Sequence, residues 1–446
     1  MALMNNAATF AKGYQLSRGV ALSADQMAQL TTDIVWLVEK DITLPDGQIT
    51  RALVPQLYVR SAQAGDLAAS GALLAGTDIH LEIGGDINNS GTIAGSNSVA
   101  ITAENIQNIG GHIQGNDVDL KSRTDLNNLG GRIEAANSLF VSAGRDINVI
   151  STTDTQANTQ SSHTNIDRMA GLYVTGDKST LLVSAGRDLN LLAAQIESSG
   201  QGGITILTAG HNLNLGTVTE SENSQLIADS KNYRKDSSRT DVGTTINTFG
   251  NITLQAGNDL TAKAASVVSS QGTLLVTAGH DVNLTTGEAS VSVDEAHQHK
   301  SKGTFSSKTV ATHDTLNETR ALATTLSGDA ITVKAGQDIN VQGSSAVATK
   351  DVTLEAQRDV IISTAEETRQ EEHVHSVKKS GLSGSGLGFS IGSQTQKSTL
   401  DSQIATQAGS TIGSIEGNVT IAAGKDVKIT GSDIISGKDT NVTAEN

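Results

Sequence analysis

The sequence predicts an all-β chain that folds as a right-handed parallel β-helix of about 20–22 residues per turn. β-Hairpin insertions are expected at every second turn, together with a small α+β N-terminal cap. Three observations predict this fold class. A phrase of the form Ala-Gly-x-Asp-aliphatic-Asn recurs along the chain, and the segments before it alternate apolar and polar residues. Residues 56–446 contain no proline, which would break a strand ladder.

The repeated phrase gives successive units a glycine and an aspartate at the same position. In the run before one phrase, Ile331 and Val333 fall on one face of a strand and Thr332 and Lys334 on the other. We expect the glycine to permit a positive φ at a corner and the aspartate to bond the backbone two residues on. The predicted structural turn residues are Gly144, Asp146, Gly186, Asp188, Gly210, Gly257, Asp259, Gly279, Asp281, Gly336, Asp338, Gly424 and Asp426.

One unit of this length has room for three short strands and three corners. Upstream, where the phrase differs, the period is kept by the equally spaced glycines Gly91, Gly111 and Gly131. A single turn cannot bury its apolar side, so the turns must stack, each adding one strand spacing of ~4.8 Å. With ten aromatic residues in 446 (five Phe, four Tyr, one Trp), the core must consist of Val, Ile, Leu and Ala.

Short and long steps alternate between the phrase glycines. The step from Gly186 to Gly210 is short, for example, and the next one, from Gly210 to Gly257, is long. We interpret each long step as one turn plus a β-hairpin that leaves the same edge. Two turns advance ~9.6 Å, the width of two strands, so the four hairpins are expected to form one eight-stranded sheet. The insertions occupy about 149–180, 216–247, 285–328 and 363–414.

The charge order of the insertions agrees with such a sheet. Asp294 and Glu295 precede Lys300 and Lys302 in the third insertion, and the second and fourth insertions also place acidic before basic residues. An acidic outgoing strand would then face the basic returning strand of its neighbour, which is a favourable cross-strand pairing. Four independent loops rich in Ser and Thr are the alternative.

The N-terminal segment differs in composition from the repeats, since it holds both prolines and the only Trp. Ser23-Ala24-Asp25-Gln26 is a capping box that predicts a short helix, and a β-hairpin is expected around the turn at 45–47. Such a cap would cover the open end of the β-helix. The predicted domains are 1–60 (cap), 61–148 (regular turns) and 149–446 (turns with the four hairpins).

Two histidine pairs are the only candidates for a metal site. His297 with His299 and His373 with His375 each put two imidazoles on one strand face. No third ligand is fixed by spacing, and solvated polar hairpin faces are the favoured interpretation. The chain has no Gly-x-Ser-x-Gly nucleophile elbow and no cysteine. We therefore predict no catalytic residue, no cofactor and no enzymatic activity.

Lys and Arg number 31 against 47 Asp and Glu, a net charge of −16 that argues against a nucleic-acid partner. Three classes of function remain: a polysaccharide-active β-helix enzyme, an adhesive stalk and a membrane-active device. The enzyme would need aromatic platforms and clustered carboxylates, which the sequence does not provide. Leu387, Phe389 and Ile391 alternate with small residues and form a candidate membrane-contact hairpin.

The phrase units and the hairpin segment at 379–392, Lys-Ser-Gly followed by Gly-Phe-Ser-Ile-Gly, resemble filamentous-haemagglutinin repeats. Such repeats occur in large exoproteins of bacterial two-partner secretion. The segments 33–38 and 53–59, Asp-Ile-Val-Trp-Leu-Val and Leu-Val-Pro-Gln-Leu-Tyr-Val, look like the stretch that leads into the second repeat block of contact-dependent growth-inhibition toxins of the CdiA type.

The resemblance implies a secreted or cell-surface protein of a Gram-negative bacterium, exported through an outer-membrane secretion pore. It also implies that this region is part of a longer polypeptide and helps to move a C-terminal toxin across the target-cell outer membrane. A haemagglutinin-type adhesin stalk that binds host or neighbouring cells is the alternative. The toxin domain has no counterpart in these residues, so its enzymatic activity is not carried over.

Overall fold

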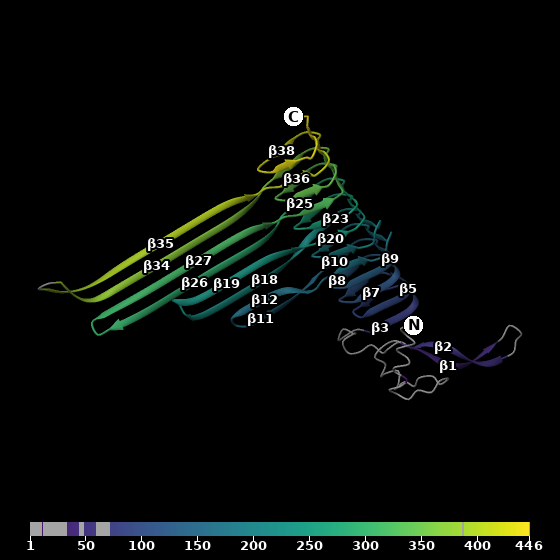
Figure 1. Ribbon diagram of the computed structural model, residues 1–446, viewed down its shortest axis with the longest axis horizontal. Helices are drawn as coiled ribbons and strands as arrows, with labels where there is room; N and C mark the ends of the chain where they lie inside the picture. Colours follow the sequence, from purple (N-terminus) through teal and green to yellow (C-terminus); the bar gives the residue numbers. More distant parts are fainter. Residues whose placement is uncertain (1–10, 12–33, 44–48, 59–71, 386–387, 446) are drawn as a thin grey trace. The chain divides into compact units, whose positions relative to one another are not determined.

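The computed structural model describes residues 11, 34–43, 49–58, 72–385 and 388–445. The chain divides into two compact units, Met1–Ala72 and Leu73–Asn446. From residue 34 onward, every secondary-structure element of the described residues is a β-strand. In the larger unit, parallel strands from successive turns stack into a β-helix from which long hairpins extend (Figure 1). The predicted fold class is therefore confirmed.

The described part of the smaller unit is one antiparallel hairpin. Its strands are β1 (Ile34–Thr43) and β2 (Ile49–Tyr58), and Leu37 lies opposite Pro55. The predicted helix near Ser23 and the turn at 45–47 lie outside the described residues. A role of this unit as a lid stays a prediction.

Three faces run along the β-helix, each built from one strand per turn. The first face consists of β4 (Ile87–Asn89), β6 (Ile106–Ile109), β8 (Leu126–Leu129), β10 (Ile147–Ile150), β15 (Leu189–Leu192), the start of β18 (Leu213–Asp229), β22 (Leu260–Lys263), β25 (Val282–Thr285), β30 (Ile339–Gln342), β33 (Val360–Ser363) and β38 (Val427–Ile429). The second face consists of β13 (Gly171–Val174), β16 (Gln195–Ser198), β20 (Thr245–Thr248), β23 (Ser266–Ser269), β28 (Thr325–Gly328), β31 (Ser345–Ala348), β36 (Thr411–Ser414) and β39 (Asp433–Ile435).

The third face follows the second after a short bend. It consists of β14 (Thr180–Ala185), β17 (Ile204–Ala209), β21 (Asn251–Ala256), β24 (Thr273–Ala278), β29 (Ala330–Ala335), β32 (Val352–Ala356), β37 (Val419–Ala423) and β40 (Thr440–Thr443). In the first turns one long strand runs through both faces, since β9 pairs with β13 and with β14. These long strands are β3 (Leu73–Glu82), β5 (Thr92–Ala103), β7 (His112–Ser122) and β9 (Arg132–Ala143).

The core is a set of aliphatic ladders, because the register stacks equivalent residues. Leu274 lies beside Ile331 and Val276 beside Val333, and all four side chains are buried. The residues between them point outward, as the alternation predicts. Burying one such side chain contributes about 1.5–3 kcal/mol, so each added turn brings several of these increments.

The phrase glycines lie at the corner before each first-face strand, but not for the expected reason. The positive-φ glycines of the described residues do not include any of them, so the expectation of a positive φ is wrong. A Cβ on Gly279 would instead overlap the carbonyl oxygen of Gly257 in the preceding turn. Glycine is required here by the close approach of two main chains.

The phrase aspartates also bond differently from the expectation. Asp281 Oδ1 accepts a hydrogen bond from the backbone N–H of Asp338, the equivalent residue of the next turn, at 3.0 Å. Asp338 Oδ1 in turn accepts one from the backbone N–H of Asp359 at 3.2 Å. The predicted bond to the backbone two residues on is therefore wrong, and the carboxylates link successive turns.

Candidate functional site

The four hairpins form one antiparallel sheet, which we call the hairpin sheet. Its strand order is β11–β12–β18–β19–β26–β27–β34–β35, so the predicted eight-stranded sheet is confirmed. The hairpins extend side by side from one side of the β-helix and lengthen toward the C-terminal turns (Figure 1). The strands not yet introduced are β11 (Thr152–Ala157), β12 (Ser161–Arg168), β19 (Asn232–Gly243), β26 (Gly287–Gly303), β27 (Ser306–Leu322), β34 (Ala365–Ser385) and β35 (Gly388–Ala408).

All four hairpins leave the β-helix between the first and the second face. The paired segments are narrower than the insertions read from the sequence, and the first differs most. It spans β11–β12, whereas the interval 149–180 also takes in β13, which stacks on the second face between β9 and β16. In turns without a hairpin the same corner is a tight turn, with positive φ at Gly343 or, at some cost in strain, at Ala264.

Buried hydroxyl groups hold the roots of the hairpins. Thr324 Oγ1, directly after β27, donates to the carbonyl oxygen of Thr285 at 2.7 Å and lies 3.1 Å from that of Ala262. Thr244 bonds Leu191 O in the same way after β19, at 2.6 Å. A chain that leaves the stack interrupts the backbone ladder, and these hydroxyls add side-chain hydrogen bonds to backbone groups at that point.

These root residues are not among those predicted from the sequence, although the sequence contains a signal for them. Each hairpin of the last three is followed by two hydroxyl residues and an aliphatic residue, namely 244–246, 324–326 and 410–412. The first hydroxyl residue is buried and the third residue enters the core. A Ser/Thr pair at the start of a strand therefore marks where an insertion rejoins the stack.

Opposite charges meet across the middle of the hairpin sheet. Arg234 Nη1 on β19 lies 3.1 Å from Glu295 Oε2 on β26, so the predicted encounter of acidic outgoing and basic returning strands is confirmed there. Between β27 and β34 the order is reversed, since Arg369 of the outgoing strand lies 2.8 Å from Glu318 of the returning strand. Such cross-strand pairs stabilise the register of the sheet.

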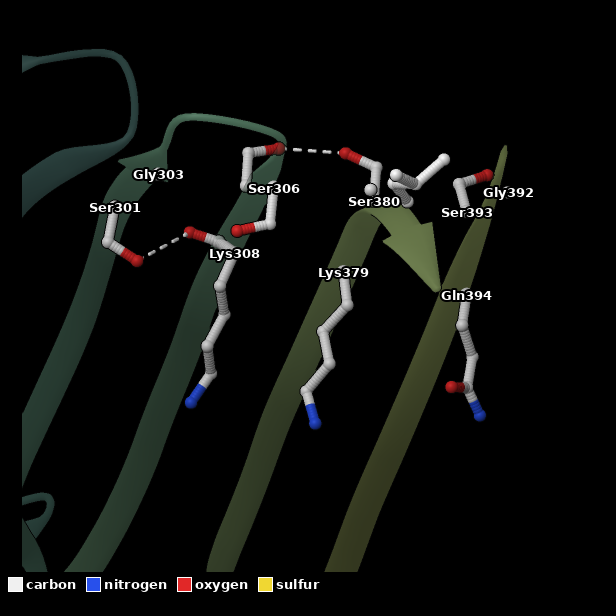
Figure 2. A pocket seen from close by; sticks show the side chains of 12 residues that line it. Ser301, Gly303, Ser306, Lys308, Lys379, Ser380, Gly392, Ser393 and Gln394 are labelled. Atoms are coloured by element: carbon white, nitrogen blue, oxygen red, sulfur yellow. Dashed lines mark hydrogen bonds between the residues drawn. The ribbon is translucent and has the colours of Figure 1, made fainter. Parts of the chain in front are cut away.

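Near the ends of the third and fourth hairpins, the charge pattern expected from the sequence is wrong. Lys308 on β27 lies directly opposite Lys379 on β34. Their side chains extend side by side along a trough of about 540 Å³ near the hairpin ends (Figure 2). Ser301, Leu382, Gln394 and several Ser and Gly residues complete its lining, which contains no carboxylate among the described residues.

The two histidine pairs lie on the hairpin sheet without converging on one point. His297 and His375 share a row across the sheet, but Thr312 of β27 lies between them. His297 contacts Glu295 of its own strand, and His373 Nδ1 lies 2.9 Å from Asp314 Oδ1. Within the ranges that the structure describes, no group of three or more His, Cys, Asp or Glu residues is placed to hold a metal ion.

The candidate membrane-contact residues lie at the end of the fourth hairpin. Leu387 is outside the described residues. Phe389 belongs to β35, and its side chain is not described. Ile391 lies opposite Leu382 and is 88% exposed, which makes it one of the most exposed large apolar side chains of the described chain.

Cations accompany the aspartate links at the corner of the β-helix. Arg187 bridges Asp146 and Asp188, two aspartates of successive turns, at 2.6 and 3.0 Å. Hydrogen bonds from Arg358 hold the pKa of the Asp338 carboxyl below its usual value, against a smaller opposing effect of burial. The arginines thus offset the repulsion between stacked carboxylates, which is a structural role.

Comparison with known proteins identifies the family of the chain. The Hemagglutinin repeat family matches residues 89–166, 227–312 and 303–446, which is more than half of the chain. The chain belongs to the hemagglutinin-repeat family. No solved structure matches the chain. Within the described residues, no helix has the length and apolar character of a membrane span.

Several relatives of this hemagglutinin-repeat chain carry the name CdiA. It is 31% identical over 253 residues to tRNA nuclease CdiA-2 of Burkholderia pseudomallei, covering 55% of the chain and 8% of that protein. It is 42% identical over 186 residues to tRNA nuclease CdiA of Escherichia coli (41% and 6%), and 40% over 206 residues to 16S rRNA endonuclease CdiA of Enterobacter cloacae (46% and 6%). The matched region is thus less than a tenth of each of these three relatives, and the chain is a repeat region of the CdiA type.

Proposed function

We propose that this region is a non-catalytic repeat scaffold of a secreted contact-dependent growth-inhibition exoprotein, and that it helps to deliver a C-terminal toxin across the target-cell outer membrane. The observation that carries the proposal is the hairpin sheet. It is a single layer, since β27 has no buried residue and β26 only two. A sheet normally buries at least one face against another layer. A long sheet that is open on both faces therefore supports a role in contact with another surface.

In this proposal the region has no enzymatic activity and no cofactor. The three relatives compared above are named as nucleases, but the chain corresponds to only 6–8% of their length. The stacked aspartates and glycines serve the contacts between turns. We assign the nuclease activities of those proteins to parts outside the matched region.

The proposed location is the surface of a Gram-negative bacterium, reached through an outer-membrane secretion pore, with later movement to the target-cell outer membrane. The absence of cysteine from the sequence supports passage through a narrow pore, because no disulfide can form before export. Stacking of each turn on the previous one would then drive folding outside the cell without an energy source. Nucleic acid is not among the proposed partners, because the net charge is −16.

The family match also supports a second candidate function. Hemagglutinin repeats suit an adhesive stalk, in which the β-helix is a spacer and the hairpins bind host or neighbouring cells. This candidate needs no transfer of a toxin. The two functions therefore differ in whether loss of a hairpin affects delivery or only attachment.

Deleting the fourth hairpin separates the two candidates. In the full-length protein with its toxin, removal of residues 365–408 joins β33 to β36 through the corner that hairpinless turns use. We expect β-rich circular dichroism and normal attachment to target cells, with growth inhibition reduced at least tenfold. A matched control removes residues 111–130, one upstream turn without a hairpin, and should inhibit growth normally. Full inhibition without the hairpin contradicts the delivery function, and loss of attachment alone favours the adhesin.

A further inference from the structure

Positive charge gathers near the ends of the third and fourth hairpins of this acidic chain. We call residues 296–313, 373–385 and 388–400 the basic tip. These segments contain six lysines and no Asp or Glu, whereas the whole chain has a net charge of −16. Such a separation of charge within one sheet creates a local positive potential that the rest of the molecule does not share.

Within the basic tip, Lys308 and Lys379 form an unfavourable pair. Like charges directly opposite each other on neighbouring strands destabilise a sheet. Farther from the hairpin ends the same two strands carry the ion pair of Arg369 with Glu318. The two ammonium groups instead share a trough that hydroxyl and amide groups line, with no carboxylate among its described residues. A doubly charged oxyanion such as a phosphate group matches this combination of charge and hydrogen-bond donors.

Exposed apolar side chains accompany the lysines. Phe305, in the turn between β26 and β27, is 76% exposed, and Leu382 and Ile391 are 45% and 88% exposed. They lie in one row, since Leu382 N–H donates to Phe305 O at 3.1 Å and Leu382 is opposite Ile391. A soluble phosphate ion has no apolar part that could contact these three side chains. The surface of an anionic bilayer offers phosphate groups and an apolar layer just beneath them.

We propose that the basic tip is a docking surface for membrane lipids with phosphate headgroups. Lys308 and Lys379 bind the phosphate, and Phe305, Leu382 and Ile391 enter the apolar boundary beneath it. This inference rests on the proposed function, since it names the membrane chemistry that the hairpins contact first. The hairpin ends would then bind the lipid headgroups, and the β-helix would hold the hairpins in place.

The test uses the 446-residue chain and vesicles of phosphatidylcholine with or without phosphatidic acid. We expect binding to the phosphatidic acid vesicles in a flotation assay, and binding roughly 30-fold weaker for Lys308→Gln with Lys379→Gln. This variant removes a repulsion, so it should fold as well as the parent chain, which circular dichroism checks. Matched controls are Lys425→Gln with Lys428→Gln, two exposed lysines of the β-helix, and the charge-conserving Lys308→Arg with Lys379→Arg. Both should bind as the parent does.

Phe305→Ser tests the source of the phosphate. This substitution should weaken vesicle binding several-fold. Inorganic phosphate, added at the total concentration of phosphatidic acid in the vesicles, should compete poorly for the parent chain. Equal vesicle binding by the Gln variant and its control would overturn the proposal. Displacement by inorganic phosphate with no effect of Phe305→Ser would assign the trough to a soluble phosphate and overturn the lipid assignment. The assay contains neither toxin nor target cell, so its failure would leave the hairpin-deletion test of delivery unaffected.

Discussion

At the corner before each first-face strand, the main chains of successive turns approach one another closely. Gly257, Gly279 and Gly336 stack there, and the Cβ that each lacks would meet the carbonyl group of the glycine below it. The same corner carries the aspartates whose carboxylates accept the N–H of the next turn. The glycine and the aspartate carboxylate thus set the distance between successive turns. Because this contact recurs from turn to turn, the same residues recur in the phrase.

Gly279→Ala should therefore destabilise the stack by about 2–3 kcal/mol, because the added methyl group forces two backbones apart. The effect is measured as a lower urea midpoint and as lost hydrogen-exchange protection in β24, β25 and β29. Gly392→Ala is the matched control, since a Cβ there meets nothing within 4 Å, and it should change stability by less than about 0.5 kcal/mol. Equal midpoints for the two variants would contradict the close-approach argument.

Each hairpin is an element whose two strands begin and end at the same corner, where the first face meets the second. A chain that leaves the stack there must satisfy backbone groups that the next turn would otherwise pair. Thr324 Oγ1 donates to Thr285 O, lies 3.1 Å from Ala262 O, and accepts a hydrogen bond from Ala265 N–H at 3.1 Å. The root hydroxyl therefore couples the hairpin to the turns above and below it.

Thr324→Val keeps the shape of this side chain and removes the hydrogen bond that its hydroxyl donates and the one that it accepts. We expect a loss of about 1–3 kcal/mol, because the backbone N–H of the buried Ala265 is left without its acceptor. Hydrogen exchange should accelerate at the inner ends of β26 and β27 and remain slow in the distant turns. Thr325→Val, at the outward-facing neighbour, is the control and should exchange like the parent chain. Uniform acceleration along the whole unit would show that Thr324 is not a local anchor.

Much of this architecture is predictable because stacking repeats the same residue at the same place. The period indicates the turns, and the long steps indicate the hairpins and their sheet. The physical reason why residue 279 must be glycine is not predictable from the sequence. A positive φ and a close approach of two main chains both require glycine, and the sequence does not distinguish them. The pairing of Lys308 with Lys379 is also hidden, since it depends on the register between strands of different hairpins. The Ser/Thr pair at 324–325 is visible in the sequence, but the role of the Thr324 hydroxyl follows only from its burial and its partners.

Over the larger unit, two spacings coincide. Hairpins recur every second turn, so their roots are ~9.6 Å apart, and each hairpin contributes two strands at ~4.8 Å. The hairpin sheet can therefore stay continuous from β11 to β35 without stretching or buckling. This match makes the sheet a collective property of the β-helix, because each hairpin fills the gap that its neighbours leave.

Removing the second hairpin should consequently split the sheet, whereas removing the fourth should only shorten it. Deletion of residues 217–243 leaves β12 and β26 three strand spacings apart, ~14 Å, which is too far for hydrogen bonds. We expect the amides of β26 that face β19 to lose protection, and β11–β12 to become a marginal isolated hairpin. In the variant that lacks residues 365–408, both regions should keep their protection in hydrogen exchange. Retained protection of β12 and β26 after the first deletion would mean that the hairpins re-pair by bending, and that the spacing of the β-helix does not dictate the sheet.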